Sequence, residues 1–425
     1  MPTWICLGPC SEVRTIADKY VPGSDVESHT DALALQSEEI LEATQQLAAP
    51  SAACFASASH ASSRGQFLGA PLSRPWKKFQ SVAADSPATV TVSRQSVVCT
   101  IAQQASAASD ADVPSNGVQK GWSYAAYGSR DNITFGDVPV PELKPNQVLV
   151  RVAAGALNPV DFKRREGKFP AKDSPFPTVP GYDVAGTVVR VGSDVKSLKP
   201  GDEVYGDINE AALENLKQVG SLAQFTAVEE HLLALKPANL SFLEAAGIPL
   251  AALTATEALE RAGLKKGQSV LILNGAGGVG TFAIQIAKQV FGAGFVGTTA
   301  SLPKTGLLEG LGADLVLDYR SDFTTLPQLY DVVFDCIGDS ERGAKVVKPG
   351  GKVICIAGNP SPPAERFVVT SSGEKLAKLT PFFESGKIRT VLDPKGPFKW
   401  KDVVSAFEHL ESGRATGKVV IGPVA

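Results

Sequence analysis

Long hydrophobic runs and metal ligands are the features that this 425-residue sequence most clearly lacks. No run of 18 or more apolar residues occurs, so we expect no membrane-spanning helix. From position 118 onward the only histidines are His231 and His409, and the only cysteines are Cys336 and Cys355. These ligands are too few and too scattered for a zinc site of the usual nitrogen and sulfur type, so we predict no bound metal.

An excess of charge of either sign is also missing once the first 117 residues are set aside. Those residues hold 7 of the 41 basic and 11 of the 44 acidic residues, which leaves 34 basic and 33 acidic residues in the remainder. A near-neutral surface argues against nucleic acid or an anionic membrane as a partner. Cys336 and Cys355 lie in apolar strand-like runs, which favours buried, reduced thiols over a disulfide or a nucleophile.

The N-terminal quarter has the composition of a targeting segment. Residues 51–109 are rich in Ser and Ala, carry several basic residues and contain Asp85 as their only carboxylate. This composition resembles a plastid transit peptide, so we expect residues 1–117 to be a disordered presequence and the protein to reach the chloroplast stroma. The acidic residues within the first 50 do not fit this interpretation and have no explanation in the sequence.

The stretch QSVLILNGAGGVG at 268–280 is the most informative part of the chain. An apolar run suited to a strand buried on both faces breaks directly into glycines, and an amphipathic helix is predicted at 279–290. Gly275 permits the tight turn, Gly277 lets backbone N–H groups approach a pyrophosphate, and Gly280 lets the helix pack closely on the strand. Strand, glycine loop and helix together predict a dinucleotide site, with the pyrophosphate covered by Gly278 and Val279.

The choice of cofactor depends on the end of the next predicted strand, FVGTTA at 295–300. An NAD site usually presents a carboxylate there to the ribose 2′-OH, whereas this chain has Ser301 and Lys304. A hydroxyl and an ammonium suit a 2′-phosphate, so we predict NADPH as the cofactor. The alternative is that Lys304 is only a solvated residue at a helix start.

The order of the predicted helices and strands divides the rest of the chain into three parts. Residues 118–240 contain short β-rich runs separated by turn residues, which predict a small antiparallel barrel. Residues 241–366 begin with helix, predicted at 243–263, and then alternate strand and helix, which specifies a doubly wound parallel sheet and an α/β fold. Residues 367–425 continue neither pattern, and we expect them to fold back on the barrel.

Four motifs give this arrangement a family resemblance: NPVDFK at 158–163, PGYDVAGTVVRVG at 180–192, KPGDEVYG at 199–206 and NGAGGVG at 274–280. Together they resemble the quinone-oxidoreductase branch of the medium-chain dehydrogenase/reductases. GDINEAAL at 206–213 and ATGKVV at 415–420 look like the plant alkenal/one oxidoreductases and 2-methylene-furan-3-one reductases of that branch. The resemblance runs from about Lys120 to the end of the chain.

The resemblance implies a GroES-like β-barrel catalytic domain joined to a Rossmann domain that binds NADPH. The implied activity is zinc-independent reduction of the carbon–carbon double bond of α,β-unsaturated carbonyls, by hydride transfer to the β-carbon and protonation of the resulting enolate. Reduction of quinones is an alternative that uses the same site. A third reading is an NADPH-binding protein without turnover, like the crystallin-like and RNA-binding relatives of this branch. Relatives occur as monomers and as dimers, and both remain open here.

Several residues become candidates for the chemistry. Lys163 matches a lysine that related enone reductases place beside NADPH, where it serves the cofactor, the substrate carbonyl or both; the alternative is a surface lysine. Asn158 stands where zinc relatives keep a metal ligand, and is expected to touch the nicotinamide ribose or the substrate. Tyr182 and Tyr205 offer phenolic protons to the enolate, or are packing residues with satisfied hydroxyls.

Further cofactor contacts follow from the resemblance alone. They lie at the adenosine end and in two stretches expected to close over the cofactor: Tyr319, Val368, Val369, Thr370, Arg414 and Ala415.

Overall fold

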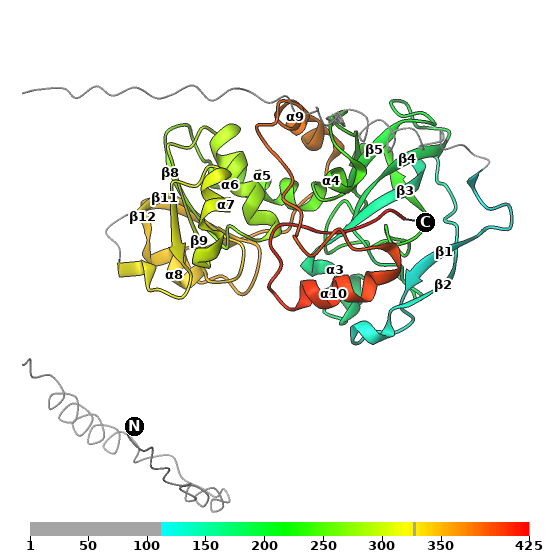
Figure 1. The fold of residues 1–425 in the computed structure, drawn as a ribbon, viewed down its shortest axis with the longest axis horizontal. Coiled ribbons are helices and arrows are strands. Elements are labelled where there is room, and N and C mark those ends of the chain that lie inside the picture. The colour runs from blue at the N-terminus through cyan, green and yellow to red at the C-terminus, as the bar shows by residue number, and fades with distance from the viewer. Residues whose placement is uncertain (1–111, 326–328, 425) are drawn as a thin grey trace, which may run out of the picture. The chain divides into compact units, whose positions relative to one another are not determined.

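Residues 112–325 and 329–424 are described by the computed structural model of the chain (Figure 1). Most of the predicted presequence, residues 1–111, lies outside this part. The folded structure starts ahead of the predicted boundary at Val118, because Val113 packs on the buried side chains of Leu149, Val189 and Phe225. Residues 112–117 are therefore part of the folded structure, and the presequence stays a prediction for residues 1–111.

An antiparallel sheet forms the first lobe. Its strand order is β14-β3-β4-β5-β7, with β6 also paired to β3, and β1 and β2 form a separate hairpin. Its strands carry valine and alanine at buried positions, as suits a half-buried pleated surface. The bounds are β1 Val118–Ser123, β2 Thr134–Pro139, β3 Gln147–Leu157, β4 Asp183–Val191, β5 Glu203–Asp207, β6 Phe225–Glu229, β7 Leu233–Leu235 and β14 Val419–Ile421.

The C-terminal end of the chain belongs to this sheet. One edge of β3 pairs with β6 along Gln147–Arg151 and with β14 along Gly155–Leu157. The two partners therefore share one edge of β3, and β4 occupies the other. The last strand thus returns to the lobe in which the described chain starts.

A parallel sheet of order β10-β9-β8-β11-β12-β13 forms the second lobe. In chain order these strands read 3-2-1-4-5-6, the order of dinucleotide-binding folds, in which ligands bind outside the carboxyl ends of the strands where the order reverses. That reversal lies between β8 and β11. The bounds are β8 Ser269–Leu273, β9 Phe295–Ala300, β10 Leu315–Asp318, β11 Tyr330–Asp335, β12 Val347–Cys355 and β13 Glu365–Arg366.

Helices cover the parallel sheet and connect the lobes. Helix α5, Pro249–Ala262, packs on α6, Gly278–Gln289, and contacts strands of both sheets. The continuous helix predicted at 243–263 is wrong, because Gly247 ends α4, Phe242–Ala246, and Pro249 starts α5. Proline at the first helical position is compatible with a new helix but not with the interior of an old one.

The other helices are short. They are α3 Pro159–Arg165, α7 Thr305–Gly310, α8 Ser340–Lys345, α9 Gly373–Glu384 and α10 Val403–Glu411, with 3-10 turns η2 Arg130–Asn132, η3 Pro170–Lys172, η4 Glu230–Leu232, η5 Leu302–Lys304, η6 Phe323–Thr325 and η7 Trp400–Asp402. Figure 1 shows α3 beside α10, which it contacts. Within residues 112–325 and 329–424 we find no helix long and apolar enough to cross a membrane.

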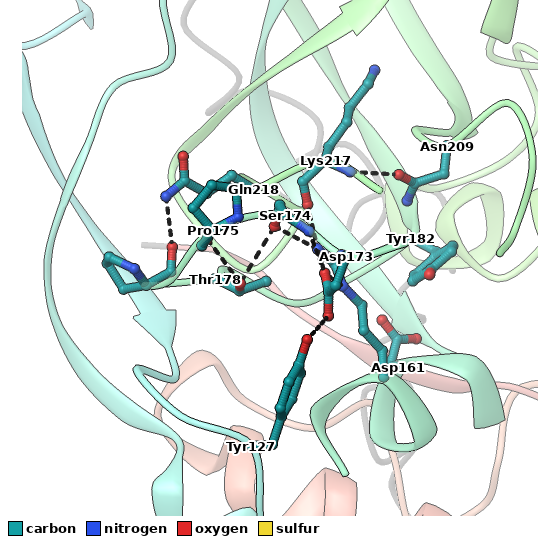
Figure 2. A network of polar contacts seen from close by, with 12 residues as sticks. Tyr127, Asp161, Asp173, Ser174, Pro175, Thr178, Tyr182, Asn209, Lys217 and Gln218 are labelled. Carbon is teal, nitrogen blue, oxygen red and sulfur yellow. Dashed lines mark hydrogen bonds and ion pairs between the residues drawn. The ribbon is translucent and has the colours of Figure 1, made fainter. Parts of the chain in front are cut away.

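A buried ion pair holds the C-terminal end of α3 in place. The Arg164 guanidinium donates from Nε to Asp173 Oδ1 at 2.7 Å and from Nη2 to the Lys217 backbone carbonyl at 2.8 Å. Tyr127 donates to the other Asp173 oxygen at 3.2 Å (Figure 2). The two ionic side chains are only 3% and 2% exposed. Because water barely reaches them, each charge depends on the other for its solvation.

We expect Arg164→Met to destabilise the protein by about 3 to 5 kcal/mol, because it leaves the Asp173 carboxylate buried without its partner. Urea unfolding followed by circular dichroism measures the change. Lys172→Met is the matched control, since it breaks an ion pair with Glu214 whose two side chains are 55% and 60% exposed. The control should cost about 0 to 1 kcal/mol. Equal losses in the two variants would contradict the assignment of Arg164 as a structural anchor.

Candidate active site

A cavity of about 410 Å³ lies where the glycine loop, α3 and the C-terminal segment meet. This volume falls in the range of small-molecule sites. Most of its wall is apolar, with contributions from Phe162, Phe169, Leu213, Leu250 and Ile337. Asn158, Lys163 and Lys418 supply side-chain polar groups.

The glycine loop is shaped by close contacts that exclude side chains. A Cβ at Gly275 would lie 2.0 Å from Thr298 Oγ1, and one at Gly280 would lie 2.2 Å from the Asn274 carbonyl oxygen. Both glycines are therefore required for helix α6 to pack on the sheet. Helix α6 begins at Gly278, and its N-cap residue, Gly277, makes no side-chain capping bond. The N–H groups of its first turn are left for an anion, and this arrangement fits a dinucleotide pyrophosphate.

The cavity brings together most of the residues predicted to bind the cofactor. Those that line it are Asn158, Lys163, Gly277, Gly278, Val279, Gly280, Val368, Val369 and Ala415. Thr370 lies in an adjoining hollow that shares Val368 and Val369 with the cavity. Gly275 acts through packing. The lining of the cavity does not include Ser301, Lys304, Tyr319 and Arg414.

The two candidate phenols point elsewhere. Tyr182, which is labelled in Figure 2, is 1% exposed, and its hydroxyl donates to the Ala212 carbonyl at 3.0 Å. Tyr205 is fully buried and donates to the Leu376 carbonyl at 3.4 Å. Burial raises the pKa of Tyr205 to about 12 and raises the pKa of Tyr182 as well, which opposes ionisation of either hydroxyl. Both side chains pack in the hydrophobic core, as the packing alternative expects, and a role of either hydroxyl in protonating the substrate stays a prediction.

Lys304 has a different position from the lining residues. It closes the turn η5 directly after β9, and its side chain is half-buried. Ser301 occupies the N-cap position of this turn without a side-chain capping bond, so both residues stand at the carboxyl end of β9, where the sequence predicted them. Tyr319 and Arg414 are exposed.

Lys418 is a site residue that the sequence reasoning missed. Its side chain is 2% exposed, and Nζ donates to Asn158 Oδ1 at 2.5 Å and to Asp183 Oδ2 at 3.0 Å. The only sequence signal for it was the ATGKVV motif at 415–420, in which a lysine stands at the start of an apolar run. A lysine is rarely buried without a carboxylate partner.

Comparison with known proteins supports a single family. The model of the alcohol dehydrogenase GroES-like domain matches residues 144–238, and the zinc-binding dehydrogenase model matches residues 311–421. The 2-methylene-furan-3-one reductase of Solanum lycopersicum is 58% identical over 76% of this chain and 84% of its own length. The chloroplastic NADPH-dependent alkenal/one oxidoreductase of Arabidopsis thaliana is 56% identical over the same shares.

The chain therefore belongs to the medium-chain dehydrogenase/reductases. Solved structures of this superfamily agree. The quinone oxidoreductase of Coxiella burnetii has a TM-score of 0.64 and 31% identity, and covers 72% of this chain and 99% of its own. A member of the alcohol dehydrogenase superfamily from Novosphingobium aromaticivorans matches equally well, with 32% identity. The predicted α/β architecture of a GroES-like lobe and a Rossmann lobe is confirmed.

The resemblance in sequence placed Asn158 at the position of a metal ligand in zinc-dependent relatives. In this member, the residues at 112–325 and 329–424 contain no group of three His, Cys, Asp or Glu side chains that could hold a metal ion. Cys336 lines the cavity, and burial raises the pKa of its thiol well above the ordinary value. The thiol is therefore protonated at neutral pH, which disfavours it as a nucleophile.

A second buried carboxylate, that of Asp161, fixes backbone segments next to the cavity. Asp161 accepts hydrogen bonds from the backbone N–H of Asn158 at 2.7 Å and of Gly181 at 2.9 Å. It thereby fixes the start of α3 against the loop that leads into β4. Burial raises the pKa of Asp161 to about 7, against the two hydrogen bonds, which favour the charged form.

This pKa predicts a pH dependence of stability. The folded-state pKa of Asp161 lies above its unfolded value, so the folded protein binds the extra proton between about pH 4 and pH 7. Relative to Asp161→Asn, the wild type should therefore lose stability as the pH rises through this window, with no further change above about pH 7. Urea unfolding of both proteins between pH 5 and pH 8 measures the difference. Parallel stability curves would show that Asp161 is ionised throughout.

Proposed function

We propose that this chain is an NADPH-dependent reductase of the carbon–carbon double bond of α,β-unsaturated carbonyls. The observation that carries the proposal is that one cavity joins an uncapped helix start behind a glycine loop to an apolar wall with a few polar side chains. A dinucleotide and a small apolar substrate can therefore meet there. The two relatives at 58% and 56% identity, named for reduction of a methylene-furanone and for alkenal/one oxidoreduction, support the same activity.

The residues present fit NADPH. The N–H groups of Gly278 and Val279 at the start of α6 hold the pyrophosphate. Ser301 and Lys304 at the end of β9 hold the 2′-phosphate, in the place where an NAD site has a carboxylate. When bound, NADPH supplies the hydride for the β-carbon of the substrate.

The chain itself contributes binding, orientation and exclusion of water. Phe162, Phe169 and Leu213 form an apolar wall that suits the hydrocarbon part of an enone. Lys163 is exposed at the rim of the cavity, where its ammonium can donate to the cofactor or to the substrate oxygen. The phenols of Tyr182 and Tyr205 are bound elsewhere, so we assign protonation of the α-carbon to water that enters past this rim.

Reduction of quinones is the second candidate. It rests on relatives such as the chloroplastic quinone-oxidoreductase homologue of Spinacia oleracea, which is 33% identical over 71% of this chain. The same cavity serves both substrates, because each is an electron-poor carbonyl compound that accepts a hydride.

We propose the plastid as the location, because relatives named as chloroplastic include those with 56% and 33% identity. The finer proposal is the stroma, reached through the Ser- and Ala-rich segment of the first 111 residues. As partner we propose a small molecule, with the protein acting as a monomer or homodimer.

NADPH oxidation at about 340 nm, the nicotinamide absorption band, tests the function. The full chain is given an enone such as 1-penten-3-one, a benzoquinone or a saturated ketone. Saturable turnover of the enone without turnover of the ketone is the expected result. Turnover of the quinone alone would replace the proposal by the second candidate, and NADPH binding without any turnover would favour a protein that only holds the cofactor.

Lys304→Ala should narrow the preference for NADPH over NADH by about tenfold or more, because one charge-assisted bond to the 2′-phosphate is lost. The preference is measured as the ratio of kcat/KM values for the two cofactors. Lys199→Ala, which removes a lysine from the barrel lobe whose side chain is 80% exposed, is the control and should leave the ratio unchanged. An unchanged ratio in Lys304→Ala would remove Lys304 from the phosphate site.

A further inference from the structure

We propose that Lys418 and Asn158 together bind the carbonyl oxygen of the substrate: Lys418 holds the Asn158 amide in one orientation, and each residue keeps one N–H donor for that oxygen. The proposal rests on the enone reductase function. It assigns an oxyanion-binding role to a buried lysine and amide at the floor of the cavity.

The geometry of the three side chains leaves Asn158 one orientation. Lys418 Nζ donates to Asn158 Oδ1 at 2.5 Å, and Asn158 Nδ2 donates to Asp183 Oδ2 at 2.8 Å. A flip of the amide would set Nδ2 against the ammonium and Oδ1 against the carboxylate. Both contacts would then be repulsive, so the lysine and the aspartate together fix the amide.

Counting donors shows what remains for a ligand. An asparagine amide has one carbonyl oxygen and two N–H donors, and a lysine ammonium has three N–H donors. Asn158 Oδ1 accepts from Lys418, and one of the two Asn158 N–H groups donates to Asp183. Lys418 uses two donors, on Asn158 and Asp183. One N–H of each residue is left, and an acceptor such as a carbonyl oxygen is the ligand atom that both can bind.

The charges of the ion pair between Lys418 and Asp183 also favour an acceptor atom in the cavity. Asn158 and Lys418 line the cavity, whereas Asp183 does not and is 0% exposed. The other Asp183 oxygen accepts from the Leu250 backbone N–H at 2.8 Å, on the side of helix α5. The positive end of the ion pair therefore faces the cavity and the negative end faces the protein. A preorganised field of this sense stabilises negative charge that develops on the substrate oxygen as the enolate forms.

The path of the lysine side chain brings it from the glycine loop to the barrel. The Gly417 N–H donates to the Ala276 carbonyl at 2.9 Å, which ties the C-terminal segment to the loop. The Lys418 stem then crosses Gly278, whose Cβ, if present, would lie 3.0 Å from Lys418 Cδ. The ammonium lies beyond this crossing, against Asn158 and Asp183, which points it at the substrate end rather than at the pyrophosphate.

The test uses the full-length double variant Lys418→Met/Asp183→Asn, which removes both charges and so leaves neither one buried alone. The matched control is Lys217→Met/Glu229→Gln, because Lys217 and Glu229 form a part-buried ion pair in the same lobe that does not line the cavity. Three quantities are measured: the NADPH Kd by fluorescence, the single-turnover rate of NADPH oxidation by the enone, and the infrared carbonyl stretch of the enone bound beside NADP⁺.

We expect the rate in the site variant to fall by about 10²-fold, the scale seen when one oxyanion donor is removed. The NADPH Kd should stay within about threefold, since the proposal gives Lys418 no phosphate contact. The downward shift of the carbonyl stretch in the wild type should be lost in the site variant and kept in the control. Asn158→Ala retains the ion pair between Lys418 and Asp183 and should also lose the shift of the carbonyl stretch. This variant replaces the double variant in the test if the double variant does not fold.

A rate and a carbonyl stretch that stay as in the wild type would overturn the proposal. A weakened NADPH Kd with an unchanged rate would also overturn it, by assigning the ammonium to the cofactor phosphates. A wild type that shifts the carbonyl stretch but never oxidises NADPH would contradict the proposed function while supporting the oxyanion role. A wild type that reduces the enone without any shift of the carbonyl stretch would support the proposed function and contradict the oxyanion role.

Discussion

The ion pair between Lys418 and Asp183 is the interaction on which the cavity depends. It joins the last strand of the chain to β4, and through Asn158 it reaches the start of α3. All three side chains are almost fully buried, so the pair is stable only when strand, helix start and loop lie in register. Because the same segment binds the glycine loop through Gly417, a single stretch of chain couples the barrel lobe to the cofactor lobe.

Buried carboxylates recur along this face of the barrel, and each has a defined partner. Asp161 accepts from two backbone N–H groups, Asp183 from Lys418 and Asn158, and Asp207 from the Ser371 hydroxyl at 2.6 Å. Burial raises the pKa of Asp207 well above its ordinary value, and the neighbouring Asp183 adds to this rise. Three buried carboxylates thus lie in this lobe, and the ammonium of Lys418 contacts one of them, Asp183. This carboxylate partner explains why a buried lysine is tolerated directly before an apolar strand.

Local sequence predicted much of the fold. The strand expected at 295–300 has these bounds in the structure, because turn residues mark both ends of the run. Helix α9 was not predicted, since it carries Pro381 in its interior and lies in a stretch without clear periodicity. Tyr182 and Tyr205 were assigned to the cleft because they stand in motifs near it. In the structure both side chains pack in the core, and no local pattern specifies the direction in which these side chains turn.

The sequence by itself determined the dinucleotide loop, because strand, turn and helix start follow one another within residues 268–280 and their geometry is local. It also determined the alternation of a parallel sheet and the absence of a carboxylate after β9. Only the tertiary structure decided that Lys418 meets Asn158, which is 260 positions away in the chain. A contact over that distance depends on how two lobes and a returning strand pack together, and so it leaves no periodic trace in the sequence.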